Sequence, residues 1–415
     1  MNMNETPSGS RYAIGLFGRR NAGKSSLINA LAGQPIAVTS EVPGTTTDPV
    51  RKAMELLPIG PVLLIDTAGL DDEGDLGAKR VEKTYEELRR CSLALVISDF
   101  AQGVTDFEAD LLAQLNRRRI PAILVLNKCD AAPPDQAFLS EMNERFGVPV
   151  LAVSARDGQG VGALKEQIIS SAAIEDDEPS LVGGLIRPGE VAVLVTPIDK
   201  AAPKGRLILP QQQTIRDLLE KDAISVVVKE NALKQALQAL AAPPAIVITD
   251  SQAFSLVAAD TPPEIPMTSF SILFARQKGD LAEMVRGARQ IERLKAGDRV
   301  LIVEGCTHHR QEDDIGTVKL PRWIREKAGD GLEFAWASGA CFPKDVSGYR
   351  LVVHCGGCML NRREMGYRVS EARAQRTYVT NYGVLIAYLM GILPRALAPF
   401  PAARLALEEE SSGKP

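Results

Sequence analysis

The sequence predicts an α/β protein of three domains whose sheets are parallel. Short apolar runs recur along the 415 residues, and most are followed by a stretch of helical periodicity, the alternation typical of parallel sheets. Polar motifs rich in Gly or Cys directly follow several of these runs, at the carboxyl ends of strands where α/β sheets place their sites. An acidic stretch at residues 174–179 and a proline-rich stretch at residues 260–266 indicate linkers between the domains.

Composition limits the class of protein. The formal net charge of −4 argues against nucleic acid or an anionic membrane as the main partner. No apolar leader opens the chain, and the longest late apolar run, residues 384–393, is about half a bilayer span. Six cysteines in such a chain indicate metal or redox chemistry rather than disulfides. We therefore expect a cytoplasmic protein, with disordered ends at residues 1–10 and 402–415.

A phosphate-binding loop opens the first domain, which we expect to span residues 11–175. The loop has the pattern G-x-x-x-x-G-K-S and lies between an apolar strand and a helix, the context that this motif needs. Its backbone N–H groups and the helix dipole would hold phosphates, Lys24 would bridge the β- and γ-phosphates, and Ser25 would hold Mg²⁺. The loop residues expected at the nucleotide are Gly18, Asn21, Gly23, Lys24, Ser25 and Ser26.

Further motifs after later strands select guanine. Asp66 begins a D-T-A-G motif, in which it would bind Mg²⁺ while the amide of Gly69 senses the γ-phosphate. Asp130 would accept hydrogen bonds from the N1–H and the amine of guanine, whereas adenine would leave this carboxylate unpaired. A backbone amide after the strand at residues 150–153 would meet the guanine carbonyl. The base-binding residues expected are Asn127, Lys128, Asp130, Ser154 and Ala155.

Together with the run at residues 44–48, these motifs resemble the translation-factor-related GTPases of the TrmE-Era type. The resemblance implies a Ras-like P-loop GTPase fold, a Mg²⁺ ligand at Thr46 in switch I, and a K⁺ ligand at Asn21. Leu70 stands where other GTPases carry a water-positioning Gln, and its side chain cannot orient the attacking water. We therefore expect slow hydrolysis of GTP to GDP and phosphate, stimulated by K⁺, by a partner or by dimerisation.

The middle domain, expected at residues 180–262, carries no chemical motif. Its strands are predicted at residues 191–195, 224–228 and 245–248, without a nucleophile, an acid–base pair or metal-ligand spacing. A parallel sheet of about three strands is marginal alone and tends to pair with another sheet. We expect a dimerisation domain here, and an intramolecular spacer is the alternative.

The third domain, expected at residues 265–395, gathers the rarest side chains of the sequence. All three histidines and three of the six cysteines fall in two short segments, residues 306–309 and 354–358. Each segment follows an apolar run, at residues 300–303 and 351–353, so both would leave parallel strands at one edge of a sheet. The sequence therefore predicts a metal site made by residues far apart in the chain.

Three thiolates, those of Cys306, Cys355 and Cys358, form the core of this predicted metal site. The fourth position is left to His308, His354, an oxygen ligand or an exogenous group. Zinc accepts such a set as a closed site, and a [4Fe-4S] cluster also takes three Cys, so the spacing does not decide between them. The remaining cysteines are expected to be structural thiols: Cys91, Cys129 and Cys341.

A TrmE-Era-type GTPase domain, a motif-poor middle and this two-part Cys/His motif resemble the [FeFe]-hydrogenase maturation GTPases over essentially residues 11–395. The resemblance implies a [4Fe-4S] scaffold that carries the di-iron precursor of the hydrogenase active site and delivers it to the apo-hydrogenase. It also implies two radical-SAM maturases as partners and a homodimer through the middle domain, possibly a tetramer. The alternative is a GTP-regulated zinc module for assembly or RNA maturation. Whether GTP hydrolysis would drive loading, release or partner exchange stays open.

Overall fold

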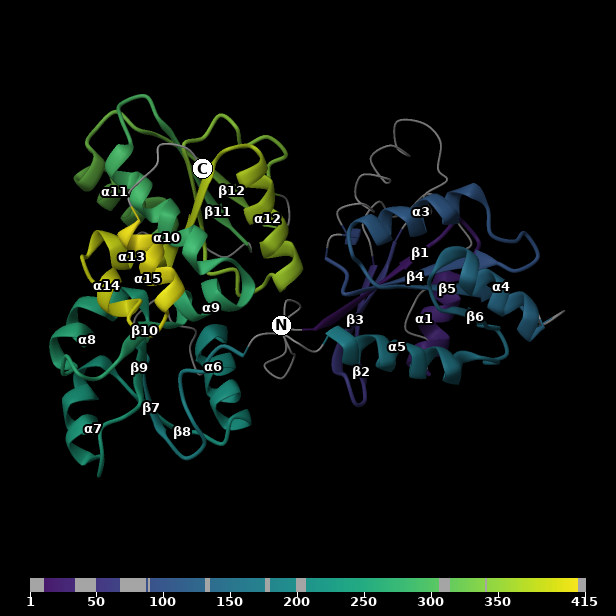
Figure 1. The fold of residues 1–415 in the computed structure, drawn as a ribbon, viewed down its shortest axis with the longest axis horizontal. Coiled ribbons are helices and arrows are strands. Elements are labelled where there is room, and N and C mark those ends of the chain that lie inside the picture. The colour runs from purple at the N-terminus through teal and green to yellow at the C-terminus, as the bar shows by residue number, and fades with distance from the viewer. Residues whose placement is uncertain are drawn as a thin grey trace. The chain divides into compact units, whose positions relative to one another are not determined.

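The computed structural model describes residues 11–33, 50–67, 87–88, 90–130, 135–175, 180–198, 207–305, 314–339 and 342–409 (Figure 1). The chain divides into two compact units, Met1–Glu178 and Pro179–Pro415. Among the described residues, every helix is too short or too polar to cross a bilayer. The expected disordered N-terminus, residues 1–10, lies outside the described part of the chain.

The first unit contains a six-stranded sheet in the order β2-β3-β1-β4-β5-β6. Four neighbouring pairs are parallel, and the edge strand β2 runs antiparallel to β3, an arrangement that the sequence did not predict. Helices cover both faces of the sheet, with α1 and α5 on one face and α3 and α4 on the other (Figure 1). The strands are β1 Tyr12–Phe17, β2 Val50–Leu56, β3 Gly60–Asp66, β4 Leu93–Asp99, β5 Ala122–Asn127 and β6 Val150–Ala152, and the helices are α1 Lys24–Ala32, α3 Asp106–Arg117, α4 Gln136–Phe146 and α5 Val161–Glu175.

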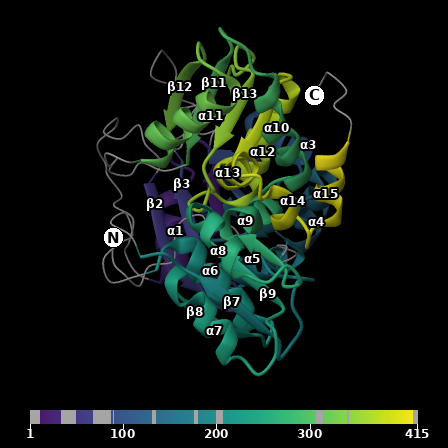
Figure 2. The same ribbon diagram turned by 90° about the vertical axis from the view of Figure 1, so that its left-hand side faces the viewer.

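The second unit contains two four-stranded sheets that are parallel throughout, in the orders β10-β9-β7-β8 and β12-β11-β13-β14. One hydrophobic core runs through both sheets and the helices that pack on them. Figure 2 shows this unit with β7, β8 and β9 at one end and β11, β12 and β13 at the other. The predicted α/β class with parallel sheets is thus confirmed. The strands are β7 Val191–Val195, β8 Ile224–Val228, β9 Ile246–Thr249, β10 Met267–Ser269, β11 Arg299–Glu304, β12 Glu333–Ser338, β13 Leu351–His354 and β14 Tyr378–Asn381.

The helices of the second unit fill the spaces beside and between these sheets. Helix α9 packs against α6, α12 and α13, so it joins elements of both halves of the unit. The helices are α6 Leu209–Glu220, α7 Leu233–Ala239, α8 Phe254–Asp260, α9 Phe270–Lys278, α10 Leu281–Arg289, α11 Leu320–Ala328, α12 Arg362–Ala374, α13 Tyr382–Leu389, α14 Leu393–Ala396 and α15 Pro401–Glu408.

Two boundaries differ from the sequence-based expectation. Strand β10 follows the proline-rich stretch at residues 260–266 and pairs with β9. The stretch therefore connects two parts of the middle domain and is not the boundary of that domain. The tail expected to be disordered from residue 402 instead forms α15, which packs on α10. Small side chains explain this packing, because Ala403 and Ala406 lie one turn apart and are buried. Residues 410–415 lie outside the described part.

Candidate nucleotide and metal sites

The predicted phosphate loop joins β1 to α1, and two of its glycines are required by close contacts. A Cβ atom on Gly18 would lie 2.3 Å from the carbonyl oxygen of Ile97, and one on Gly23 would lie 2.1 Å from Nδ2 of Asn127. Gly23 also has a φ of 93°, a left-handed conformation that favours glycine. The backbone of the loop therefore lies so close to Ile97 and Asn127 that a side chain at Gly18 or Gly23 would clash with them.

Lys24 is buried at the start of α1, and its ammonium group is held over the loop. Its Nζ donates to the carbonyl oxygens of Gly18 and Arg19, at 2.9 Å each. Bound phosphate oxygens would compete with these carbonyls for the same N–H groups. The cation is thus positioned by the loop that would receive the phosphates.

Ser25 and Asp66, the two predicted Mg²⁺ ligands with described positions, are in contact. Oγ of Ser25 donates to Oδ2 of Asp66 at 2.6 Å. Burial raises the pKa of Asp66 above its ordinary value, although the Ser25 hydrogen bond and the Lys24 charge oppose that shift. The geometry thus brings a hydroxyl and a half-buried carboxylate to one point beside the phosphate loop. Thr46 and Gly69 lie outside the described residues.

Asn127 ties the phosphate loop to the base-binding loop. Its Nδ2 donates to the carbonyl oxygen of Ala22 at 2.8 Å, and its Oδ1 accepts from the amide of Ala155 at 3.1 Å. Both bonds are made by a side chain that is buried at the end of β5. The sequence predicts Asn127 at the base, and in the structure its side chain joins the two loops that would surround the nucleotide.

Asp130 and its neighbours lie at the same edge of the sheet. Asp130 is exposed, and its Oδ1 accepts from Oγ of Ser154 at 3.3 Å. Lys128 adopts a φ of 67° and donates through Nζ to Oδ2 of Asp99 at 2.8 Å. This hydrogen bond is the main cause that lowers the pKa of Asp99. The sequence-based prediction did not include Asp99 among the site residues. Its position as a carboxylate at the end of a buried strand was the signal that could have identified it.

The strands that precede the two halves of the predicted metal site, β11 and β13, are parallel neighbours. Val303 of β11 is in register with His354 of β13. The amide of Gly305, which directly precedes Cys306 in the sequence, donates to Sγ of Cys355 at 3.1 Å. Cys306, His308 and Cys341 lie outside the described residues. The chain therefore brings the residue before one predicted ligand to the sulfur of another.

The Cys355–Cys358 loop suits a thiolate-bound metal group. Gly357 has a φ of 63°, and its amide also points at Sγ of Cys355, at 3.4 Å. Backbone N–H groups directed at a cysteine sulfur stabilise the thiolate form and tune a bound cluster. Burial raises the pKa of the Cys358 thiol, partly offset by the charge of Lys278. A bound metal would favour the thiolate form of such a thiol.

His354 is buried beside this loop with both ring nitrogens engaged. Nδ1 donates to the carbonyl oxygen of Cys355 at 2.8 Å, and Nε2 accepts from Nη1 of Arg368 at 3.0 Å. Arg368, itself buried, is held in turn by Glu364 at 2.9 Å. Burial, reinforced by the Arg368 charge, lowers the pKa of His354 to about 3, so the ring is neutral. In this arrangement His354 supports the Cys355 backbone, and both of its ring nitrogens are engaged by hydrogen bonds within the protein.

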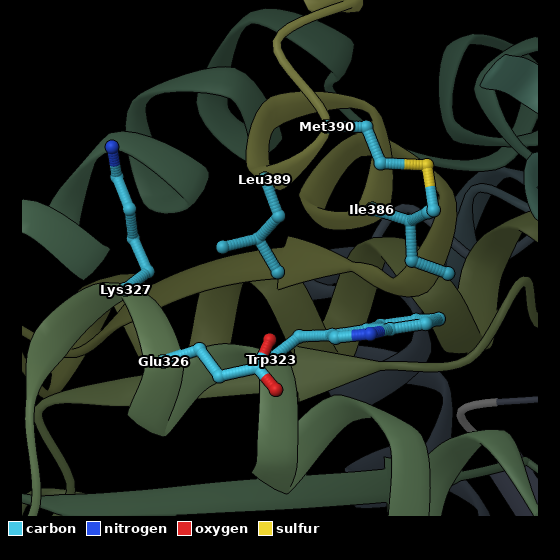
Figure 3. Close-up of a pocket in the computed structure, with 6 residues that line it drawn as sticks. All are labelled: Trp323, Glu326, Lys327, Ile386, Leu389 and Met390. Carbon is cyan, nitrogen blue, oxygen red and sulfur yellow. The ribbon is translucent and has the colours of Figure 1, made fainter.

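A cavity of about 240 Å³ lies elsewhere in the second unit, between α11 and α13 (Figure 3). The indole ring of Trp323 faces Ile386 and Met390 across it, and Glu326 and Lys327 lie along α11 (Figure 3). Its lining contains no cysteine or histidine.

Within the described ranges, no group of three or more His, Cys, Asp or Glu side chains is arranged to hold a metal ion.

Comparison with protein-family models finds three matches along the chain. A 50S ribosome-binding GTPase model matches residues 13–128. A hydrogen maturase F dimerization domain matches residues 181–279, and a hydrogen maturase F tetramerization domain matches residues 282–399.

Curated relatives match the first unit. The chain is 36% identical over 160 residues to the tRNA modification GTPase MnmE of Nitrosomonas europaea, covering 38% of this chain and 34% of that protein. It is 37% identical over 163 residues to the GTPase Der of Chloroflexus aurantiacus, covering 36% of each chain. The chain thus spans about a third of the length of these relatives.

Among solved structures, Aquifex aeolicus Era bound to GDP and AlF4⁻ is 19% identical, with a TM-score of 0.36, and the match covers 52% of this chain and 93% of that one. The FeoB G-domain of Methanococcus jannaschii is 23% identical, with a TM-score of 0.31, and the match covers 39% of this chain and 98% of that one.

Proposed function

Since the chain belongs to the hydrogen maturase F family and carries a GTPase domain, we propose that it is a GTP-hydrolysing scaffold of hydrogenase assembly. In this role it binds a [4Fe-4S] cluster, carries the di-iron precursor of the [FeFe]-hydrogenase active site and delivers it to the apo-hydrogenase. Two radical-SAM maturases would supply that precursor. The family models that support this role together match more than half of the 415 residues.

The observation that carries the cluster proposal is the meeting of β11 and β13 at Cys355. Two backbone N–H groups, those of Gly305 and Gly357, point at its sulfur, and the next residue after Gly305 is Cys306. We propose Cys306, Cys355 and Cys358 as the three thiolate ligands. The cluster would supply an iron site with an open or weakly held position to which the precursor could attach.

The fourth ligand is proposed to be His308 or an exogenous group rather than His354. His354 remains a candidate from the sequence, but its two hydrogen bonds, to Cys355 and Arg368, would both have to be rearranged for ligation. A ring that donates to the backbone of a ligand cysteine instead holds that cysteine in place.

GTP hydrolysis is proposed to rest on the phosphate loop and bound cations. Lys24 and the loop amides would stabilise the charge that develops on the phosphates, and Asp130 would select guanine. Mg²⁺ held by Ser25, Asp66 and Thr46 would neutralise charge on the phosphate oxygens. Leu70 offers no group to orient the attacking water, so we expect GTP hydrolysis to be slow.

Metal analysis of anaerobically reconstituted protein tests the scaffold proposal. About four iron and four sulfide per chain, with broad absorbance near ~400 nm, are expected for a [4Fe-4S] cluster. One zinc per chain and a colourless protein would refute the scaffold while leaving the GTPase domain untouched. The alternative, a GTP-regulated zinc module of assembly or RNA maturation, would then take its place.

Replacing Asn21 by Gly is expected to remove stimulation by K⁺. Asn21 has a φ of 61°, so glycine keeps the loop conformation while deleting the side-chain oxygen proposed to ligate the cation. Rates of GTP hydrolysis in K⁺ and in Na⁺ should become equal, with the Na⁺ rate unchanged from that of the wild type. A stimulation ratio that stays at the wild-type value would show that Asn21 does not hold the cation.

The proposed homodimer forms through the edge strand β8. Ile224 and Val227 on this strand are 51% and 42% exposed, and an apolar edge strand invites pairing with a second sheet. The double variant Ile224→Asp, Val227→Asp is expected to weaken dimerisation at least ~10-fold, because like charges would face each other across the edge.

Sedimentation velocity over a range of protein concentrations measures this effect. Leu405→Asp is the matched control, because Leu405 is 62% exposed on α15, outside the middle sheet. An unchanged dissociation constant in the double variant, or an equal change in the control, would reject β8 as the interface. Whether dimers pair further into a tetramer is read from the same data.

A further inference from the structure

Helix α9 ends beneath the Cys355–Cys358 loop, and its last residue is a buried lysine. Lys278 is 7% exposed. Its Nζ donates to the carbonyl oxygens of Gly357 at 3.2 Å, Cys358 at 3.3 Å and Leu360 at 2.7 Å. An ammonium group has three N–H donors, and these three carbonyls belong to the Cys355–Cys358 loop and the two residues that follow it.

A buried ammonium is costly unless its surroundings compensate the charge. The features that compensate Lys278 include the backbone carbonyls, the carboxyl end of α9, and the ring of Phe274, whose centroid lies 4.9 Å from Nζ. While the carbonyls turn toward Lys278, the amide of Gly357 points at Sγ of Cys355. The lysine therefore fixes the loop in the conformation that presents the Gly357 N–H group to the sulfur of Cys355.

We propose that Lys278 is a positioning residue for the metal group held by the Cys355–Cys358 loop. It acts through the loop backbone, and its buried positive charge stabilises a bound group of net negative charge. Three thiolates around a [4Fe-4S] cluster or around zinc both make such a group. The inference rests on the proposed metal site, but not on which metal fills it.

The contact also joins two regions of the chain that match different family models. Lys278 lies within the region matched by the dimerization domain, and the loop lies within the region matched by the tetramerization domain. On the same helix, Arg276 donates to the carbonyl oxygens of Leu181 and Gly183, at 3.4 and 2.7 Å. Arg276 is thus a second cation of α9 whose hydrogen bonds lie away from the cysteine loop.

The test of Lys278 uses the full-length chain. Each protein is reconstituted anaerobically with stoichiometric iron and sulfide. Lys278→Met is expected to bind several-fold less iron than the wild type and to shift the cluster midpoint potential to a more negative value. The potential shifts because removing a nearby cation destabilises the more negative, reduced cluster. Lys278→Arg should restore most of the iron content, and Arg276→Met should match the wild type in both measurements. The GTP hydrolysis rate of Lys278→Met should also equal that of the wild type.

Full iron content and an unshifted potential in Lys278→Met would overturn the inference. Equal effects in Lys278→Met and Arg276→Met would also overturn it, because they would assign the loss to the packing of α9. If Lys278→Met does not fold, Lys278→Gln takes its place, with the same expected loss and the same refutation. If the wild type takes up zinc and no iron, the proposed function fails, and the zinc affinity of the two Lys278 variants then tests the inference in the same way.

Discussion

Asp130→Asn is expected to lower the affinity for GTP at least ~100-fold and to create binding of xanthosine triphosphate. Guanine presents two N–H donors to this position, and the carboxylate can accept from both. The asparagine amide can accept only one of them, because its NH2 group would face the other donor. Xanthine carries a carbonyl where guanine carries its amine, so the new amide donor finds an acceptor. Asp130 is exposed at the edge of the sheet and close to Ser154, so the replacement leaves the core intact.

The measurement is titration with GTP, xanthosine triphosphate and ATP, with hydrolysis rates for each. Asp157→Asn is a suitable control, because Asp157 lies in the loop after β6 and only its backbone amide contacts Ser154. Unchanged GTP affinity in Asp130→Asn would remove Asp130 from the base-binding site. The cluster content should be equal in all three proteins, because the two sites belong to different units of the chain.

Cys355→Ser is expected to abolish most of the iron content while leaving the rate of GTP hydrolysis within about twofold of the wild type. Cys355 is the sulfur on which the β11 and β13 segments converge, since it accepts from both Gly305 and Gly357. A serine hydroxyl keeps the shape of the loop but is a poor ligand for iron. Iron, sulfide and the visible spectrum measure the first effect, and phosphate release measures the second.

Cys91→Ser is the matched control for this variant. Cys91 is a buried thiol of the first unit whose Sγ contacts the carbonyl oxygen of Glu87 at 3.2 Å, a bond that a serine can keep. Its iron content should equal that of the wild type. A Cys355→Ser protein that retains its full cluster would exclude Cys355 as a ligand. Joint loss of cluster and GTPase activity in a folded variant would contradict the division into two independent sites.

Local signals in the sequence predicted the α/β class, strands in each of the three expected domains, and the motifs of the nucleotide site. The phosphate loop and the Asn127–Asp130 motif are short segments, so their chemistry follows from residues a few positions apart. The positions of β11 and β13 followed in the same way, because apolar runs of β-branched residues predict buried strands. Helix α15 was missed because its buried face consists of alanines, which give little hydrophobic contrast.

Only the tertiary structure decided which distant side chains meet. The sequence named Ser25 and Asp66 separately, and the sheet places them 2.6 Å apart. It offered His354 as a metal ligand, whereas the fold directs the two ring nitrogens to Cys355 and Arg368. It gave no signal for Lys278, which lies about 80 positions before the loop that it supports. Periodicity and turn chemistry act over a few residues, while hydrogen bonds between buried groups depend on how separate elements pack.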